Sequence, residues 1–448
     1  MLSPQSVPAS DSGSGLAFLL RRDPVVITGA GAVSAAGEGV EALWTAVVNR
    51  QSPAGWCRLP GPGGGMVDRV GFPVPELDWA GHPWRGMARR LDAGGRMALR
   101  AAYAAADQAG LLGNDSRPQP TPERLGVICG SSRGPIGKWE EAYDLMHTGQ
   151  RMKPTLAATT TLAAASGALA QVLEANGPSW LVSAACASGA FAIAAAAERI
   201  ALGYADVMLA GGTDQSLNAV VCSGLAAAGV MARSSGEPAD WCRPFCLDRT
   251  GLVPGDGAGL LVLESLSSAR RRGVTPLAVL SGWGLGMDPE GLAGMDAGGA
   301  GLRRTMTDAL ALAGLSPADI GYINAHGTGT WKNDAAEASA MAAVFGPEMP
   351  PCSSSKSITG HCLGATPALE AILCLQALRR GILPPAFPTA HTTPAAAAVE
   401  RKEKGPDPAG AVRFSPGGPC PGLRHALSSS AGFWGFQSSL IFSRWEEA

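Results

Sequence analysis

Four side chains able to do chemistry stand where a predicted strand passes into a predicted helix: Cys186, His326, Lys356 and His361. A thiol at the N-terminus of a helix feels the positive end of the helix dipole and nearby backbone N–H groups, which favour the thiolate. We therefore expect a lowered pKa for Cys186. Histidines at the carboxyl ends of strands occupy the usual position of active-site groups in α/β folds. Together the four residues predict covalent catalysis through Cys186 with assistance from imidazole.

Each of these residues also has a plainer interpretation. Cys186 could be a small buried side chain at the start of an alanine-rich helix, and His326 could be a structural or surface histidine. Lys356 is harder to explain as surface, because the chain has six lysines against 29 arginines and this lysine lies among small residues. A cysteine with two histidines also fits a thiol hydrolase, in which one imidazole is the base.

The elements that must position these turns alternate between strands and helices. Predicted strands cover residues 25–28, 125–129, 207–210 and 259–264, and a helix is expected around residues 39–48. Such alternation is typical of a layered α/β fold.

A rough internal duplication relates the two parts of the chain. In each part a helix precedes a short predicted strand, at 125–129 and at 320–324. Each part then reaches a turn of small residues followed by a helix, at 183–189 and at 355–361. Two similar halves packed face to face would place both turns near one shared cleft.

This duplication defines the expected domain organisation. Residues 23–270 form a first half that carries the nucleophilic cysteine, and residues 271–448 form a second half that carries both histidines and the lysine. Residues 1–22 are rich in Ser, Pro and Gly, and we predict that they form a disordered arm.

The composition is that of a compact globular protein. Hydrophobic residues make up 46% of the 448 residues and charged residues 16%, with a formal net charge of −2. This balance offers no basic face for nucleic acid, and the longest apolar stretches, rich in Ala, Ser, Thr and Gly, are poor bilayer spans. Ten cysteines at scattered spacings predict reduced thiols rather than disulfides or a metal site. We therefore expect a cytoplasmic protein without metal, nucleic acid or membrane span.

Three sequence blocks carry a resemblance to a known family. They are SAACASGA around Cys186, NAHGTGT around His326, and SSSKSITGHCLGA, which contains Lys356 and His361. In order and spacing, over residues 24–445, they resemble the active-site blocks of beta-ketoacyl-acyl-carrier-protein synthases, closest to the synthase II and type II polyketide ketosynthase branch. The resemblance implies the thiolase fold, an α/β architecture of five layers, α/β/α/β/α, with two duplicated halves, usually as a dimer.

The family's chemistry implies a role for each group. Cys186 would accept an acyl group from the phosphopantetheine arm of an acyl carrier protein, with the backbone N–H groups of Cys186 and Phe433 as an oxyanion hole. His326 and His361, as neutral imidazoles, would bind the malonyl thioester carbonyl and stabilise the enolate formed when carbon dioxide leaves. Lys356 would orient the histidines, and no metal or redox cofactor is needed. The expected supporting residues are Asp334, Glu337, Glu370, Thr328 and Thr330.

The chain departs from the family pattern in two places. In the glycine-rich block near the C-terminus, Ala431, Trp434 and Phe436 stand where the family has Phe, Gly and Thr. Glycine allows backbone angles that other residues avoid, so Trp434 is expected to change the path of this loop or to fill part of the cleft. Cys246 and Thr250 stand where the family often has aspartates, which would loosen a structural hydrogen-bond network.

Three other functions on this fold are alternatives to the condensation catalysed by a beta-ketoacyl synthase. A chain-length-factor-like partner subunit typically lacks the nucleophile, which this chain retains. A degradative thiolase uses a second cysteine as base where this chain has His361 and Lys356. A binding scaffold gives no reason for four reactive groups at cleft positions. We therefore expect condensation of malonyl-acyl-carrier protein in fatty-acid, polyene or polyketide biosynthesis, by a homodimer or by a heterodimer with a chain-length-factor-like subunit.

Overall fold

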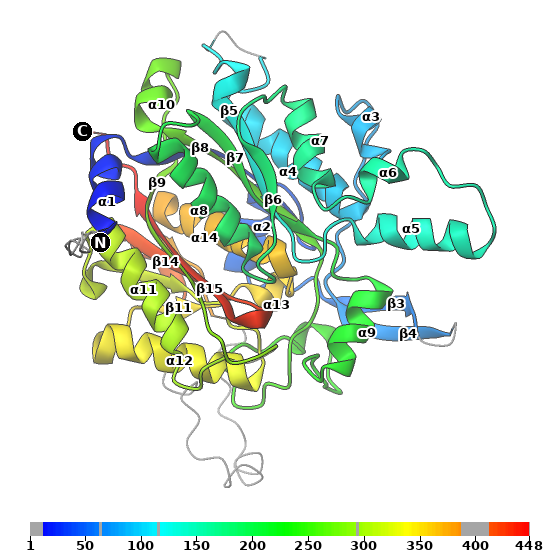
Figure 1. Cartoon of the computed structure of the whole chain (residues 1–448). Coiled ribbons are helices and arrows are strands. Elements are labelled where there is room, and N and C mark those ends of the chain that lie inside the picture. Colours follow the sequence, from blue (N-terminus) through cyan, green and yellow to red (C-terminus); the bar gives the residue numbers. More distant parts are fainter. Residues whose placement is uncertain (1–11, 62–64, 114–116, 293–294, 387–411, 448) are drawn as a thin grey trace, which may run out of the picture.

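Two five-stranded sheets of matching topology form the framework of the protein (Figure 1). The structure, a computed structural model, describes residues 12–61, 65–113, 117–292, 295–386 and 412–447. The first sheet has the strand order β6-β5-β7-β8-β1 and the second the order β11-β10-β14-β15-β9. The two sheets join where β1 pairs with β9 through two residue pairs, Val26 with Val279 and Ile27 with Ala278.

The pairing within the sheets confirms the predicted duplication. In each sheet the first three strands are parallel and the remaining pairings are antiparallel. The strands of the first sheet are β1 (Val25–Ser34), β5 (Leu125–Gly130), β6 (Ser179–Val182), β7 (Val207–Asp214) and β8 (Gly257–Ser265). Those of the second are β9 (Ala278–Met287), β10 (Tyr322–Asn324), β11 (Cys352–Ser353), β14 (His425–Ala431) and β15 (Phe436–Arg444).

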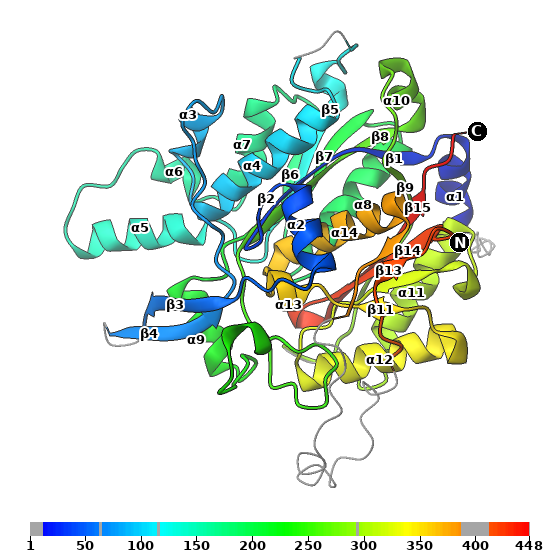
Figure 2. The same cartoon turned by 180° about the vertical axis from the view of Figure 1, so that it is seen from behind.

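Helices complete the five predicted layers (Figures 1 and 2). Helices α4 (Ala93–Gln108) and α7 (Ala164–Val172) cover the outer face of the first sheet, and α11 (Ala300–Ala313) and α12 (Trp331–Phe345) lie outside the second. Helices α8 (Ser188–Ala201) and α14 (Thr366–Arg380) lie between the sheets. The five-layered α/β/α/β/α architecture is therefore confirmed.

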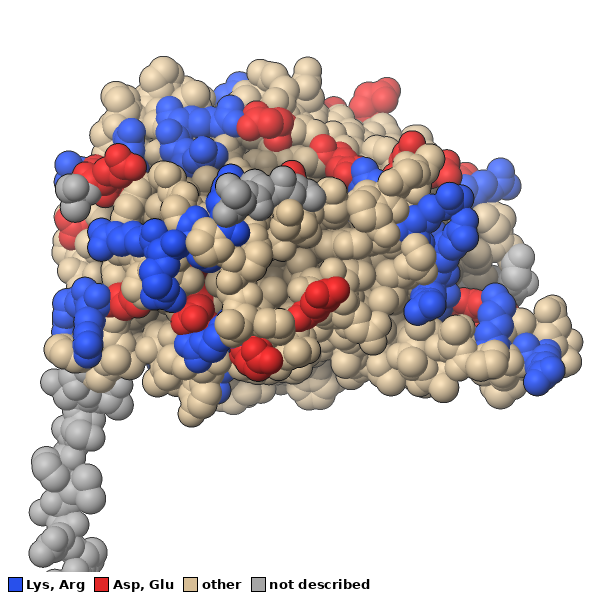
Figure 3. Space-filling view, turned by 90° about the horizontal axis from the view of Figure 1, so that it is seen from above, with Lys and Arg blue, Asp and Glu red and all other residues tan. Residues whose placement is uncertain are grey.

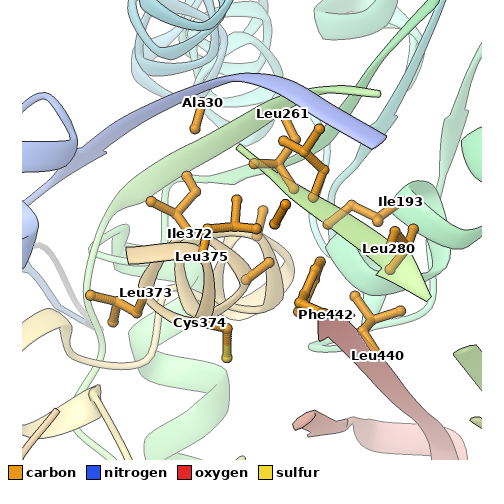
Figure 4. Packing of buried hydrophobic residues seen from close by; sticks show 14 of the residues in the cluster. Ala30, Ile193, Leu261, Leu280, Ile372, Leu373, Cys374, Leu375, Leu440 and Phe442 are labelled. Carbon is orange, nitrogen blue, oxygen red and sulfur yellow. The ribbon is translucent and has the colours of Figure 1, made fainter. Parts of the chain in front are cut away.

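The central helix α14 explains how the two sheets pack. Every residue from Thr366 to Leu378 is buried, as expected for a helix that is apolar around most of its circumference, with Glu370 and Gln376 as polar exceptions. Figure 4 shows Ile372 and Leu375 of this helix within one hydrophobic cluster that also contains Leu261 and Phe442, from strands of different sheets. Because both sheets bury a face against this layer, the ends of their strands are held close together.

Helix α4 packs closely against strand β1 on the outer face of the first sheet. A Cβ atom at Gly31 would lie 1.9 Å from the carbonyl oxygen of Ala101 on α4. Only glycine permits this approach of a helix backbone to a strand.

Further helices and strands lie around the two sheets and their main helices. They are α1 (Ser12–Arg22), β2 (Gly37–Glu38), α2 (Val40–Val48), β3 (Gly55–Pro60), β4 (Met66–Gly71), α3 (Arg85–Ala88), α5 (Ile136–His147), α6 (Leu156–Thr159), α9 (Ala219–Ala227), α10 (Leu266–Arg272), α13 (Lys356–Thr359), β12 (Ile382–Leu383) and β13 (Gly418–Pro419). The first half ends with α10 and the second opens with β9. Helix α5 projects from the body in both views (Figures 1 and 2).

The predicted disordered arm at residues 1–22 is wrong for its second part. Residues 12–22 form helix α1, in which Ala17 and Leu20 are buried and Leu16 packs against the central cluster. The Ser- and Gly-rich composition concealed these apolar residues at helical spacing. Residues 1–11 lie outside the described part of the chain.

The surface carries mixed charge. On the face seen in Figure 3, Lys and Arg side chains lie among Asp and Glu side chains, in keeping with the net charge of −2. Within the described ranges, no helix combines the length and the apolar character needed to cross a membrane.

Candidate active site

One cavity of about 500 Å³ collects side chains from both halves. Cys186 reaches it from the turn between β6 and α8, His326 from the turn after β10, and His361 from the segment between α13 and α14. Phe433, after β14, also lines this cavity. The predicted convergence of turns on one cleft is therefore seen. Lys356 does not line the cavity but is fully buried.

Cys186 lies in a tight turn that ends β6 and begins α8. Ala185 takes a left-handed φ of 48°, an unusual value for alanine. Ser188 holds the turn, because its Oγ accepts a hydrogen bond from the Ala184 N–H at 2.9 Å and donates one to the Ala185 carbonyl at 2.6 Å. Cys186 as a whole is 8% exposed.

The backbone N–H groups of Cys186 and Phe433 come together beside this thiol. A Cβ at Gly432 would lie 2.8 Å from the Cys186 nitrogen, so glycine allows the two segments to touch. The Phe433 N–H also opposes the rise in the pKa of the Cys186 thiol, as expected for a donor that faces the sulfur. Neither N–H donates to a backbone carbonyl in the part of the chain that the structure describes. Two such donors beside a nucleophile have the arrangement of an oxyanion hole.

Burial dominates the ionisation of the Cys186 thiol. It raises the pKa of Cys186 to about 12, because a buried thiolate loses its hydration. Arg133, Lys356 and the Phe433 N–H oppose this rise, and Asp214 adds to it. The lowered pKa that we expected from the helix N-terminus is therefore wrong. The thiol is therefore protonated at neutral pH.

The two imidazoles stand edge to face, with ring centroids 5.3 Å apart and an interplanar angle of 80°. Nδ1 of His361 shares a hydrogen bond with Oγ1 of Thr366 at 3.2 Å, whereas Nδ1 of His326 has no hydrogen-bond partner among the described residues. Burial and the positive charge of Lys356 lower the pKa of both histidines well below its ordinary value. Both are neutral at physiological pH, so each can donate one N–H to a substrate oxygen.

Lys356 joins three segments of the second half. Its Nζ donates hydrogen bonds to Oε1 of Glu370 on α14, at 2.7 Å, and to the backbone carbonyl of His326. Burial raises the pKa of Glu370 to about 7, and the charge of Lys356 opposes that rise. The lysine thus holds the His326 turn against the central helix, a contact that suits the orienting role we predicted.

Two buried carboxylates on α12 accept hydrogen bonds from the backbone of the turn that begins at His326. Glu337 accepts hydrogen bonds from the backbone N–H groups of His326, at 2.7 Å, and Gly327, at 2.8 Å. Asp334 accepts one from the N–H of Gly329 at 3.2 Å. Burial raises the pKa of both carboxyl groups, and these N–H donors oppose the rise. Both residues therefore act on the backbone of the turn rather than on the imidazole.

The wall of the cavity continues along this turn. Thr328 and Thr330 both line it, and their hydroxyls are hydrogen bonded at 2.8 Å. The five predicted supporting residues thus divide into two that line the cavity and three that lie behind it.

The hydrogen-bond network around Arg249 is intact although Cys246 and Thr250 stand where the family often has aspartates. Arg249 is fully buried, pairs with Asp334 at 3.5 Å and lies over the Trp331 ring at 3.9 Å. It also donates to the Cys246 carbonyl at 3.0 Å, a contact that needs no side chain at position 246. The Thr250 hydroxyl accepts a hydrogen bond from the Arg233 N–H at 3.0 Å. The expected loosening is therefore not seen at Arg249, which sequence reasoning did not single out.

Trp434 keeps a glycine-like backbone. Its φ is 64°, and its N–H donates to the Leu292 carbonyl at 2.9 Å. A left-handed conformation at a bulky residue costs roughly 1–3 kcal/mol. Trp434 and Phe436 both line the cavity, and Phe436 packs edge to face on Phe191 at 5.8 Å. Trp434 is 56% exposed and lines the rim of the cleft, so the left-handed backbone shows that the predicted change of loop path is not needed, and the side chain does not fill the cleft.

Sequence reasoning also missed three polar residues that hold the site. Thr366 bonds the His361 ring, the Ser429 hydroxyl donates to Glu337, and Asp214 accepts hydrogen bonds from both halves. Thr366 opens α14 five residues after His361, Ser429 belongs to the glycine-rich block, and Asp214 ends β7, four residues beyond the strand predicted at 207–210. Their positions were visible in the sequence, but their partners are distant in it.

Fold and site together define a condensing enzyme of the thiolase fold, in which two duplicated halves contribute one cysteine and two histidines. The family description "Beta-ketoacyl synthase, N-terminal domain" matches residues 22–269, and "Beta-ketoacyl synthase, C-terminal domain" matches residues 277–392. The chain therefore belongs to the beta-ketoacyl synthase family, the acyl-transferring condensing enzymes of fatty-acid and polyketide synthesis.

Known proteins of this family cover most of the chain. Nodulation protein E of Rhizobium sp. (strain N33) is 36% identical over 369 residues, which are 81% of this chain and 87% of that protein. The mitochondrial 3-oxoacyl-[acyl-carrier-protein] synthase of Arabidopsis thaliana is 35% identical over 330 residues, 72% of this chain and 68% of that protein. The solved structure of the ishigamide ketosynthase/chain length factor has a TM-score of 0.80 at 28% identity and covers 95% of this chain and 100% of that one.

The pKa of about 12 predicts how Cys186 reacts with an alkylating reagent. Because only the thiolate reacts, its alkylation rate by iodoacetamide should rise about tenfold per pH unit from pH 7 to 10, without a plateau. Peptide mass spectrometry measures the rate at Cys186 separately from that at Cys420, which is partly exposed. A plateau reached below pH 8 would show a thiolate and contradict the raised pKa.

The buried lysine predicts a non-additive effect on stability. Lys356→Met should lower the free energy of unfolding by about 3–5 kcal/mol, because it leaves Glu370 buried without its cation. Lys356→Met/Glu370→Leu should recover much of that loss. Urea unfolding followed by tryptophan fluorescence measures both variants. If the double variant costs the sum of the two single ones, the two side chains are not coupled.

Proposed function

We propose that this chain is a beta-ketoacyl-acyl-carrier-protein synthase that condenses malonyl-acyl-carrier protein with an acyl chain held on Cys186. The observation that carries the proposal is the meeting of one thiol with two neutral imidazoles in a single cavity. Among the described residues that line this cavity, Cys186 is the one cysteine, whereas a thiolase needs a second. A hydrolase would need one imidazole to be charged or to be oriented by a carboxylate, but burial and the charge of Lys356 lower the pKa of both imidazoles and keep them neutral.

In the first half-reaction, Cys186 attacks the thioester of an acyl-acyl-carrier protein. The Cys186 proton leaves with the phosphopantetheine thiol, and the acyl group remains on the sulfur as a thioester. The negative oxygen of the tetrahedral intermediate would accept hydrogen bonds from the N–H groups of Cys186 and Phe433.

In the second half-reaction, the malonyl thioester carbonyl accepts hydrogen bonds from His326 and His361. Loss of carbon dioxide places the negative charge on that oxygen as an enolate, which neutral N–H donors stabilise without protonating its carbon. The enolate carbon attacks the acyl-Cys186 carbonyl and expels the Cys186 thiolate, which takes up one proton from solvent to regenerate the thiol. A cationic imidazole would be a stronger acid, so the lowered pKa of both histidines suits this step. The reaction balances without a metal or redox cofactor.

The partners follow from the relatives and the surface. The Arabidopsis thaliana relative is named for an acyl carrier protein, and the ishigamide ketosynthase is paired with a chain length factor. We propose an acyl carrier protein as substrate donor and a second subunit, identical or chain-length-factor-like. Helix α5 exposes Trp139, Tyr143 and Met146, which are 55%, 60% and 69% exposed, and an exposed apolar cluster is typical of a subunit interface. Ten free thiols suit a reducing, cytoplasmic compartment.

Acylation of the nucleophile tests the proposal. The protein, with acyl-acyl-carrier proteins of several chain lengths, should gain one acyl group on Cys186, read by intact-protein and peptide mass spectrometry. Cys186→Ala should gain none, whereas Cys57→Ala, outside the cavity, should be acylated like the unaltered protein. An unaltered protein that gains no acyl group from any carrier would contradict the proposal and favour a chain-length-factor-like role.

A further inference from the structure

The cavity that contains Cys186 carries positive charge without a neutralising carboxylate. Among its described lining residues the charged side chains are Arg133 and Lys332, and none is Asp or Glu. The guanidinium of Arg133 forms no hydrogen bond or ion pair within the described part of the chain, whereas the buried Arg249 and Arg272 each pair with a carboxylate. A guanidinium is charged at every physiological pH and has five N–H donors to offer.

A buried carboxylate fixes the turn that presents Arg133. Asp214, at the end of β7, accepts hydrogen bonds from the Ser132 N–H at 2.8 Å and the Arg133 N–H at 3.1 Å. It also accepts hydrogen bonds from the Ser131 hydroxyl at 2.7 Å and from the N–H of Gly364, in the other half, at 2.7 Å. These contacts engage both carboxylate oxygens. The Arg133 side chain therefore projects from a backbone that is held in place.

Arg133 and Cys186 line the same cavity. After burial, Arg133 has the largest influence on the pKa of Cys186, ahead of Asp214 and Lys356. The pKa values of His326 and His361 respond to Lys356 but not to Arg133. The charge of Arg133 thus acts on the nucleophile, in agreement with their place in the lining of one cavity. An acyl chain bonded to Cys186 would share this cavity with the guanidinium.

We propose that Arg133 is a specificity-determining residue that binds an oxygen acceptor on the acyl chain, above all a carboxylate. The inference rests on the proposed function, because the chain must first be bonded to Cys186. A guanidinium binds a carboxylate through two parallel, charge-assisted hydrogen bonds. A saturated alkyl chain has no acceptor and gains nothing from this group. The substrate class is thus an oxygen-bearing acyl chain rather than a plain fatty acyl chain.

The test compares two acyl chains of similar length, adipyl with a terminal carboxylate and heptanoyl without one, on the same carrier protein. The rate at which each forms an adduct on Cys186 is measured by intact-protein mass spectrometry. The unaltered protein should favour adipyl by about tenfold, the ratio expected for one charge-assisted hydrogen bond. Arg133→Leu should bring the ratio close to one, and Arg133→Lys should restore part of it. Lys332→Leu removes the other cation of the cavity and should leave the ratio unchanged.

The outcomes separate this inference from the proposed function. If Arg133→Leu slows both chains equally, the arginine serves the carrier arm rather than the acyl chain, and the inference fails alone. It also fails if the unaltered protein acylates both chains at the same rate. If the unaltered protein forms no adduct with either chain or with the longer series, the proposed function fails and this inference with it. A heptanoyl adduct on Arg133→Leu shows that the altered site is still folded.

Discussion

The buried ammonium group of Lys356 is the contact on which the site depends. It links α14, the helix that both sheets bury, to the backbone of the His326 turn, and its own helix α13 leads directly to His361. The two imidazoles are thus placed relative to each other by one side chain that touches neither substrate nor ring. The fold supplies the other condition, because the central helix layer encloses this ion pair completely.

The same burial decides the ionisation of every reactive group. It raises the pKa of the Cys186 thiol and lowers the pKa of both histidines, so the site starts with all three groups neutral. Neutral donors suit an enolate, which must be stabilised but not protonated at carbon. The site therefore avoids a stable thiolate–imidazolium pair, which is the starting state of many cysteine hydrolases. Decarboxylative condensation agrees with this electrostatic state better than hydrolysis.

The fold class and the catalytic side chains could be predicted from the sequence, because short sequence blocks and the order of elements indicate them. The strand-to-helix turns at Cys186 and His361 are short blocks of small residues, and the repeated order of elements indicated two halves. The pKa of Cys186 could not be predicted, because its sign depends on how much of the molecule covers the thiol. Helix α1 was missed because packing of Leu20 against a distant cluster, and not composition, stabilises it. Arg133 was missed for the same reason, since its relation to Cys186 spans 53 positions and exists only in the fold.

The central claim is that one cavity couples loss of carbon dioxide to carbon–carbon bond formation. It is tested most directly by a single turnover, in which protein already acylated on Cys186 is mixed with malonyl-acyl-carrier protein labelled in its free carboxyl group. We predict one labelled carbon dioxide for each beta-ketoacyl product and each acyl group lost from Cys186. His326→Ala and His361→Ala should keep the acyl group and release little carbon dioxide. Loss of the acyl group as free acid, without carbon dioxide, would show a thiol hydrolase and contradict the account.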